Sequence, residues 1–213
     1  MKKPRVLLAD DHNIVLMGLK SLLEGEFEIV GSVQDGRALV NQAAALHPDV
    51  IVADISMPHL NGIEAVRRIK ITDKNIKIVF LTMHPDVTYA ASAFEAGASG
   101  FVLKHSAPSE LVTAIHEAMK GKTYVTPLIA GDLIHSYQEG VSPEKFLLKK
   151  ISPRQQEVLQ LLAEGKSAKE IASVLEISTK TVEFHKYKMM EQLNIKTSAE
   201  LVQYAMKHGI ISI

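Results

Sequence analysis

Residues 50 to 62 have the sequence VIVADISMPHLNG. The stretch begins with an unbroken apolar run from Val50 to Ala53, and Asp54 follows this run directly. A strand that is apolar along its whole length, rather than at alternate positions, is typical of a parallel sheet covered by helices on both faces. Residues 50 to 53 are therefore predicted to form a central, fully buried strand.

Similar apolar runs recur through the first 120 residues and alternate with segments of helical spacing. The predicted strands cover residues 6–9, 27–33, 50–53, 76–81 and 100–103. The predicted helices cover residues 14–24, 37–46, 63–71, 88–96 and 109–120. Strict alternation of five strands and five helices predicts an α/β domain, a five-stranded parallel sheet with helices on both faces.

The remainder of the chain predicts a linker followed by an all-α domain. Residues 122–150 contain scattered glycine and proline and predict a linker with one short helix around residues 128–137. Beyond them lie helix-start signals, namely the capping pairs Ser152/Gln155, Ser167/Glu170 and Thr197/Glu200 and a further cap at Ser178. Four helices are predicted, over residues 153–164, 168–175, 179–193 and 198–208. The predicted domains are thus 1–121 and 151–213, joined by the linker 122–150.

Composition excludes several classes of site. The chain has no cysteine, which excludes disulfides, thiolate zinc sites and cysteine nucleophiles. No apolar run reaches the roughly 18 residues that a membrane-spanning helix needs, so we expect a cytoplasmic protein without a membrane partner. The formal net charge is zero. Residues 1–140 carry 13 Lys and Arg against 16 Asp and Glu, and residues 141–213 carry 11 against 8, a small asymmetry that suits a cation-binding part joined to a nucleic-acid-binding part.

Polar side chains follow the predicted strands at the points where the strands end. These residues are Asp10, Asp11, Asp54, Thr82 and Lys104. Because the carboxyl ends of parallel strands meet at one edge of an open sheet, we expect all five side chains to lie together there. Carboxylates without cysteine or histidine ligands favour a hard cation such as Mg²⁺, and a carboxylate can act as a nucleophile towards phosphorus. Asp54 is the best-placed nucleophile, and Mg²⁺ with the Lys104 ammonium would neutralise an incoming phosphoryl group.

Residues 4 to 120 resemble the receiver domains of two-component response regulators. The resemblance lies in LLADDH at 7–12, in Asp54, Met57, Pro58, Asn61 and Gly62, in VFLTMH at 79–84 and in GFVLK at 100–104. It implies a flavodoxin-like, doubly wound sheet with Asp54 as the phosphoacceptor, and a partner sensor histidine kinase whose phosphohistidine donates the phosphoryl group. It also implies Mg²⁺ ligands at Asp10, Asp11, Asp54 and the main-chain carbonyl of Ser56. The implied switch and phosphoryl-binding residues are Thr82, Phe101 and Lys104.

The chain departs from the common receiver pattern at three positions. His105 follows Lys104 where many receivers have proline, and a cis peptide before a non-proline residue costs about 3 kcal/mol, so a trans bond is expected. Phe101 lacks the hydroxyl of the tyrosine that is common there, so its part in a switch can be steric but not hydrogen-bonded. Met83 follows Thr82 where a small residue is usual, and we expect its side chain to restrict water near the phosphoryl group.

Residues 151 to 209 resemble the DNA-binding domain of regulators of the quorum-sensing and nitrate-response type. Their sequence has the pattern of a helix-turn-helix. The matching stretches are ISPRQQEVLQLLAEGKSAKEIA and TVEFHKYKMMEQLNIKTSAELVQYA. The resemblance implies that helix 179–193 enters the major groove of double-stranded DNA. Candidate base contacts are Thr181, Glu183, Phe184 and Tyr187, and candidate phosphate contacts are Lys180, Lys186 and Lys188. Glu176 stands where many such turns have glycine, and a positive φ there would cost on the order of 1 kcal/mol.

The leading hypothesis is a transcription regulator that is switched by phosphorylation of Asp54. Phosphorylation would draw Thr82 and Phe101 inward, change the surface around residues 88–96 and 100–103, and release the recognition helix, favour a homodimer, or both. A Mg²⁺-dependent aspartyl phosphatase would need a carboxylate two residues after Asp54, where Ser56 stands, so the chain is expected not to be an enzyme beyond slow hydrolysis of its own phosphoaspartate. A nucleotide-binding protein is not favoured, since neither GxGxxG nor GxxxxGK[ST] occurs.

Overall fold

The computed structural model describes residues 3–106, 108–138, 151–207 and 210–211. The chain divides into two compact units, residues 1–143 and 144–213. Each unit has its own hydrophobic core.

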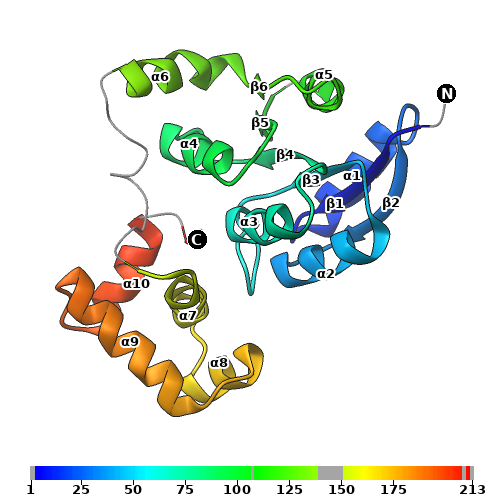
Figure 1. The fold of residues 1–213 in the computed structure, drawn as a ribbon. Helices are drawn as coiled ribbons and strands as arrows, with labels where there is room; N and C mark the ends of the chain where they lie inside the picture. The colour runs from blue at the N-terminus through cyan, green and yellow to red at the C-terminus, as the bar shows by residue number, and fades with distance from the viewer. Residues whose placement is uncertain (1–2, 107, 139–150, 208–209, 212–213) are drawn as a thin grey trace. The chain divides into compact units, whose positions relative to one another are not determined.

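The first unit is built on a parallel sheet with the strand order β2-β1-β3-β4-β5-β6 (Figure 1). Its strands are β1 (Arg5–Ala9), β2 (Glu28–Val33), β3 (Val50–Ala53), β4 (Lys77–Thr82), β5 (Gly100–Leu103) and β6 (Tyr124–Val125). Every residue of β3 is buried, whereas β2 at the edge is only partly buried. The prediction of a central strand at residues 50–53 is confirmed, and the first five strands have the flavodoxin-like order.

Helices cover both faces of this sheet, as the continuous apolar strands require. One face carries α1 (Asn13–Leu23) and α5 (Pro108–Met119), and the other carries α2 (Gly36–Leu46), α3 (Gly62–Thr72) and α4 (Val87–Glu95). Successive strand residues point to opposite faces, so Val50 and Val52 pack with α1 and α5, and Ile51 and Ala53 pack with the other three helices. The five predicted helices are present within one residue at each end.

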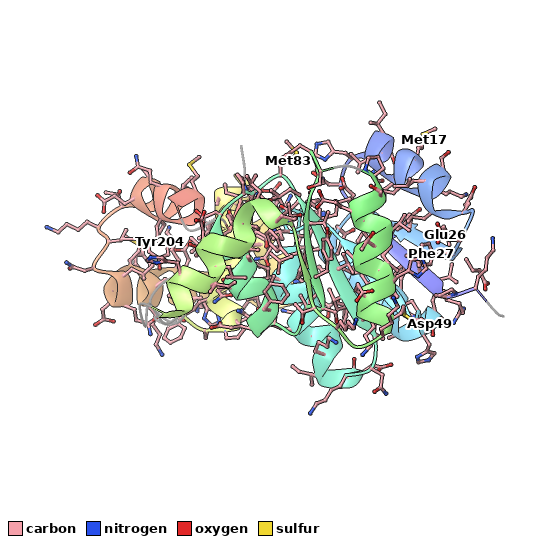
Figure 2. The ribbon with its side chains drawn as sticks, turned by 90° about the horizontal axis from the view of Figure 1, so that it is seen from above. Met17, Glu26, Phe27, Asp49, Met83 and Tyr204 are labelled. Atoms are coloured by element: carbon pink, nitrogen blue, oxygen red, sulfur yellow. The ribbon has the colours of Figure 1, made fainter. Side chains whose placement is uncertain are left out.

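The strand register brings the carboxyl ends of the strands to one edge. Ala9 pairs with Ala53, Ala53 with Phe80, and Thr82 with Leu103. Figure 2 shows Met83, which follows β4, near one end of this unit and Asp49, which precedes β3, near the other. The residues that follow β1, β3, β4 and β5 are thereby placed close together.

A sixth strand and a further helix lie beyond residue 121, where the sequence predicted the first domain to end. Tyr124 N–H donates to Ser99 O at 3.0 Å and thereby adds β6 to the sheet, a strand that the sequence did not predict. Helix α6 (Pro127–Gln138) corresponds to the short helix expected around residues 128–137, and its Ile129 and Leu133 are buried in the core that α4 also joins. Residues 139–150 of the predicted linker lie outside the described residues.

The second unit contains four helices within the described residues, α7 (Pro153–Ala163), α8 (Ala168–Leu175), α9 (Thr179–Leu193) and α10 (Ser198–Lys207). Ser152 with Gln155 and Ser167 with Glu170 form complete capping boxes, and Ser178 accepts a hydrogen bond from Thr181 N–H at the start of α9. Ile171, Ala172, Leu175, Val182 and Met189 of α8 and α9 are buried in a shared core.

Among the described residues, no helix combines the length and the apolar character that a membrane-spanning segment needs.

Candidate functional site

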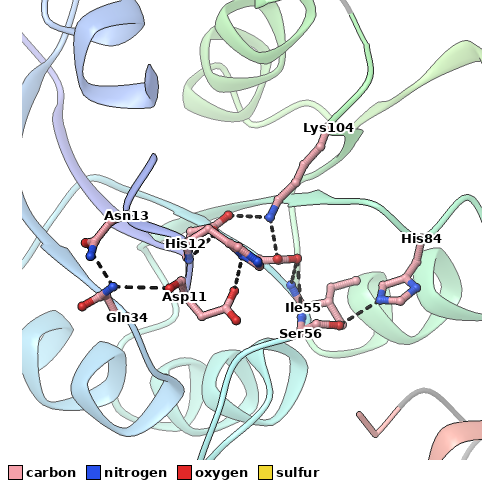
Figure 3. Close-up of polar contacts among 10 residues, drawn as sticks. Asp11, His12, Asn13, Gln34, Ile55, Ser56, His84 and Lys104 are labelled. Atoms are coloured by element: carbon pink, nitrogen blue, oxygen red, sulfur yellow. Dashed lines mark hydrogen bonds and ion pairs between the residues drawn. The ribbon is translucent and has the colours of Figure 1, made fainter. Parts of the chain in front are cut away.

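Lys104 joins two of the acidic side chains at the carboxyl edge of the first sheet (Figure 3). Its Nζ lies 2.6 Å from Asp54 Oδ2 and 2.6 Å from Asp10 Oδ2. Both carboxylates are almost fully buried, with side chains 6% and 1% exposed. The geometry brings together three of the residues that the sequence placed at this edge, although their chemical roles stay predictions.

Main-chain hydrogen bonds between strands hold these three side chains in position. Asp54 N–H donates to Ala9 O at 2.8 Å, and Lys104 N–H donates to Thr82 O at 2.8 Å. The Asp54 side chain is held in addition by its neighbours, since Oδ1 accepts from Ile55 N–H at 2.6 Å and from Ser56 N–H at 3.4 Å. The carboxylate is therefore oriented by the backbone of its own loop.

Burial and the lysine act in opposite directions on the pKa of Asp54. Burial raises the pKa of Asp54, and the hydrogen bond and charge of Lys104 lower it, but the net direction is upward from the usual value. Burial alone would lower the pKa of Lys104, but the hydrogen bonds and charges of Asp10 and Asp54 together raise it above its usual value. The ammonium therefore stays charged, and burial disfavours the ionised form of Asp54.

The residues at this edge have the donor set that a hard divalent cation prefers. Asp10 and Asp11 form with His12 the group of three metal-ligand side chains that the described residues bring within 4.8 Å of one another. Asp11 Oδ1 is buried and accepts no hydrogen bond from the described residues, although His12 Nδ1 lies 2.8 Å away and would pair with it when protonated. A buried carboxylate oxygen of this kind fits a cation ligand. His12 was not expected in this group, and its signal in the sequence is only its place next to the two aspartates.

Two glycines allow the loop after β3 to pack closely around Asp54. A Cβ on Gly62 would lie 2.0 Å from Asp54 O, and a Cβ on Gly36 would lie 1.9 Å from Leu60 O. Asn61 caps α3 by accepting a hydrogen bond from Glu64 N–H at 2.9 Å. The Asn61-Gly62 pair therefore lets α3 begin directly against the main chain of the candidate nucleophile.

The predicted switch residues Thr82 and Phe101 are both fully buried. Thr82 Oγ1 accepts a hydrogen bond from His84 N–H at 3.3 Å. Phe101 pairs with Phe80 on the neighbouring strand and belongs to the core, and its part in a switch stays a prediction. The peptide after Lys104 is trans, as expected, because no cis bond occurs in the described residues. Met83 is 61% exposed.

His84 makes side-chain contacts that the sequence did not reveal. Its Nε2 lies 2.8 Å from Ser56 Oγ, and its ring stacks on Tyr89 with a centroid distance of 4.4 Å. Burial lowers the pKa of His84, against the charges of Asp54 and Asp86, which raise it. Asp86, in turn, caps α4 by accepting from Thr88 N–H.

All seven candidate DNA contacts lie on α9 in the second unit. Lys180, Phe184, Tyr187 and Lys188 are exposed, and Thr181, Glu183 and Lys186 are partly exposed. Phe184 and Tyr187 are 59% and 63% exposed, although large apolar rings are usually buried. Lys188 Nζ lies 5.6 Å from the centroid of the Phe184 ring, and Lys186 pairs with Glu183 at 3.4 Å. Exposed aromatic and cationic groups on one helix fit a surface that contacts DNA.

The turn between α8 and α9 has the positive φ at Glu176 whose cost the sequence raised as a possibility. Glu176 has φ 53° and ψ 45°, the left-handed conformation that favours glycine. Ile177 N–H donates to Ala172 O at 3.0 Å, so the turn closes the end of α8 despite the missing glycine. Arg154 also contacts this end, with Nη2 donating to Leu175 O at 2.6 Å.

Comparison with protein families identifies both units. A family model described as the response regulator receiver domain matches residues 6–116. A second model, described as bacterial regulatory proteins of the luxR family, matches residues 149–205.

Relatives of known identity match along nearly the whole chain. The chain is 34% identical over 209 residues to the response regulator UvrY of Escherichia coli, covering 96% of this chain and 94% of that protein. It is 34% identical over 215 residues to the oxygen regulatory protein NreC of Staphylococcus epidermidis, covering 97% and 99%. Among solved structures it is similar to RcsB of Salmonella enterica serovar Typhimurium bound to a promoter with the phosphomimetic BeF3−, with 31% identity, 97% and 100% coverage and a TM-score of 0.64. Another similar structure contains two RcsB dimers bound to two parallel DNAs, with 31% identity, 95% and 98% coverage and a TM-score of 0.58.

Proposed function

The chain belongs to the two-component response regulators that join a receiver domain to a luxR-family DNA-binding domain, and we propose that phosphorylation of Asp54 controls its binding to DNA. It is a transcription regulator that binds DNA, and it is not a conventional enzyme. The receiver domain implies a kinase as its partner.

The observation that carries the proposal is the position of Lys104 Nζ, 2.6 Å from both Asp54 and Asp10. An Asp54 carboxylate oxygen attacks the phosphorus of a phosphohistidine on a sensor histidine kinase, and the leaving imidazole nitrogen keeps the electron pair of the broken N–P bond. Lys104 is already within reach of the atom that would accept the phosphoryl group, so its ammonium can neutralise the charge that arrives. We expect the protein to hydrolyse this phosphoaspartate only slowly.

Asp10, Asp11 and Asp54 would hold Mg²⁺ together with the main-chain carbonyl of Ser56. The carboxylates of Asp10 and Asp11, which lie within 4.8 Å of each other, support this assignment. When bound, the cation supplies positive charge for the phosphoryl oxygens.

Thr82 is proposed to turn its hydroxyl towards the phosphoryl group. In the present conformation its Oγ1 accepts one long hydrogen bond from His84 N–H, which is weak enough to break when the hydroxyl turns to donate to a charged phosphoryl oxygen. Phe101, already buried, supports the switch sterically from the neighbouring strand.

Helix α9 is proposed to enter the major groove of double-stranded DNA. Lys180, Lys186 and Lys188 would contact phosphates and fix the position of the helix. Thr181, Glu183, Phe184 and Tyr187 would contact base edges, with Glu183 accepting from a cytosine amine and Phe184 touching a thymine methyl group.

A homodimer is proposed for the phosphorylated protein. Dimers of the similar protein RcsB bind DNA. Two copies of α9 in such a dimer would contact half-sites about one helical turn apart. The proposed kinase and DNA partners support a location in the cytoplasm.

The proposal is tested by incubation with a phosphoramidate and Mg²⁺, with the wild type compared with Asp54→Ala. Phosphate incorporation, dimer fraction and affinity for duplex DNA are measured on the same samples. We expect all three to rise in the wild type and none to rise in the variant. Incorporation that persists without Asp54 would assign the phosphoacceptor elsewhere.

A further inference from the structure

We propose that His84 is a positioning residue that couples the state of the Asp54 site to helix α4. The inference rests on the proposed function, because it concerns how phosphorylation of Asp54 would reach the surface of the receiver. The imidazole and main chain of His84 make three contacts, with Ser56, Thr82 and Tyr89. Figure 3 shows the first of them, the hydrogen bond between the His84 ring and Ser56.

The first contact is with the loop that carries the candidate nucleophile. His84 Nε2 and Ser56 Oγ lie 2.8 Å apart and share a hydrogen bond. Ser56 is two residues after Asp54, and its N–H approaches Asp54 Oδ1 at 3.4 Å. Converting the Asp54 carboxylate into an acyl phosphate changes the charge opposite the Ser56 N–H, so this loop is directly exposed to the change.

The second contact is with the candidate switch hydroxyl. His84 N–H donates to Thr82 Oγ1 at 3.3 Å, which lies outside the best range for a hydrogen bond. A rotation of Thr82 towards a phosphoryl group would take away this acceptor. The main chain at residue 84 is then released at the same time as the Ser56 loop changes.

The third contact carries the change to α4. The His84 ring is nearly parallel to the Tyr89 ring, with an interplanar angle of 18° and a centroid distance of 4.4 Å. Tyr89 lies in the first turns of α4 and is partly buried against the core. A shift of the imidazole therefore cannot leave Tyr89 in place without breaking a stacked contact.

Phe101, the aromatic residue on the neighbouring strand β5, is a weaker candidate for carrying a change from Asp54 to the surface of the receiver. Phe101 is fully buried and has no hydroxyl with which to form a hydrogen bond. His84, in contrast, has one polar contact with Ser56, one with Thr82 and one ring contact with Tyr89 of α4. The arrangement fits a residue that transmits a change better than one that only fills space.

The test measures amide hydrogen exchange of α4 with and without phosphoramidate and Mg²⁺, in the full chain, together with phosphate incorporated per chain. Ser56→Ala removes the hydrogen bond alone, Tyr89→Leu removes the stack alone, and His84→Leu removes both. His84→Gln keeps a polar group that can reach Ser56. Responses are normalised to the phosphorylated fraction, so that a change in phosphorylation itself does not enter the comparison.

A matched control is available on the other face of the sheet. His116 has one side-chain hydrogen bond, to Glu26 at 2.7 Å, and one ring contact, with Phe27 at 5.1 Å. His116→Leu therefore removes contacts of the same two kinds, but on α5 and away from the Ser56 loop. We expect this control to respond as the wild type does.

In the wild type we expect phosphorylation to change exchange in α4. Ser56→Ala and Tyr89→Leu should each reduce this response about fivefold, the effect of losing one ordinary hydrogen bond or one stacked pair. His84→Leu should reduce it at least as much, and adding either of the other substitutions to His84→Leu should change nothing further. His84→Gln should recover the part that depends on Ser56.

Two results would overturn the inference without contradicting the proposed function. If Asp54 is phosphorylated and the His84 and Tyr89 variants keep the wild-type response of α4, His84 does not couple the two sites. If phosphorylation leaves α4 exchange unchanged in the wild type, there is no response for His84 to transmit. If the wild type takes up no phosphate, the proposed function fails, and the inference fails with it.

Discussion

Replacing Lys104 with methionine removes the cation between two buried carboxylates while keeping a side chain of similar length. Asp10 Oδ2 and Asp54 Oδ2 each lie 2.6 Å from Lys104 Nζ, so the two oxygens are separated by no more than twice that distance. Two unit charges roughly 5 Å apart repel by about 3 kcal/mol at an effective dielectric constant of about 20. Loss of one partner from a buried ion pair costs roughly 3–5 kcal/mol. We expect Lys104→Met to lower the free energy of unfolding of the first unit by an amount in that range near neutral pH, without added divalent cation.

The size of the loss depends on pH in a defined direction. Burial raises the folded-state pKa of Asp54 above its usual value, and removing Lys104 raises it further. A carboxyl group with a raised folded-state pKa contributes stability that is present below the unfolded-state pKa and is lost as pH rises through the folded-state pKa. The difference between the variant and the wild type should therefore be largest above the folded-state pKa and should shrink as the pH falls towards the unfolded-state value.

The assay is a urea titration followed by the amide NMR signals of β3, which report the first unit separately from the second. Asp54→Asn is added to Lys104→Met and should restore most of the lost stability, because it removes one of the two repelling charges. Lys120→Met is the control, since Lys120 is 60% exposed in its pair with Glu117, and a change of no more than about 0.5 kcal/mol is expected. The reasoning is refuted if Lys104→Met is no more destabilising than this control, or if Asp54→Asn rescues nothing.

Four further outcomes follow from single positions. Glu176→Gly should raise the free energy of unfolding of the second unit by about 0.5–1 kcal/mol in a urea titration, since φ is 53° there, and no gain would show that the turn stores no strain. Gly62→Ala should cost on the order of 1–3 kcal/mol in the first unit and reduce phosphate uptake, because its Cβ would lie 2.0 Å from Asp54 O, and a neutral result would mean that the loop yields without cost. Met83→Ala should shorten the lifetime of the phosphoryl group measured by phosphate release, and an unchanged lifetime would show that the exposed methionine does not restrict water. Lys180→Ala should reduce the slope of log affinity against log salt for duplex DNA by about 0.9, whereas an unchanged slope would mean that Lys180 contacts no phosphate.

The strands and helices were predictable because burial on both faces of the sheet leaves a simple pattern. β3 is apolar at all four positions, and every one of them is buried. The capping boxes of α7 and α8 were likewise predictable, since each depends on two side chains three residues apart. β6 has only two residues and no apolar run, and its pairing depends on main-chain hydrogen bonds to β5 that leave no pattern in the side chains.

The candidate site was predictable only as far as strand ends determine it. The carboxyl edge of a parallel sheet brings Asp10, Asp54 and Lys104 together whatever the loops do. The contact of Ser56 with His84 depends instead on the conformation of two loops that are 28 residues apart in the sequence. Hydrophobic periodicity contains no information on such loops, which is why the sequence did not indicate His84.

The double pairing of Lys104 places a condition on how Asp54 can react. A carboxylate oxygen that accepts a charge-assisted hydrogen bond at 2.6 Å is a weaker nucleophile than a free one, since its lone pair is already engaged. Positive charge supplied to Asp10 and Asp11 would release the ammonium from Asp10 and allow it to follow the phosphoryl oxygens. A lysine suits this exchange, because its ammonium is a compact charge on a flexible stem, whereas the planar fork of an arginine would bind a carboxylate through two fixed hydrogen bonds. The residue that stabilises the resting site is thus also one that can change partners when Asp54 is modified.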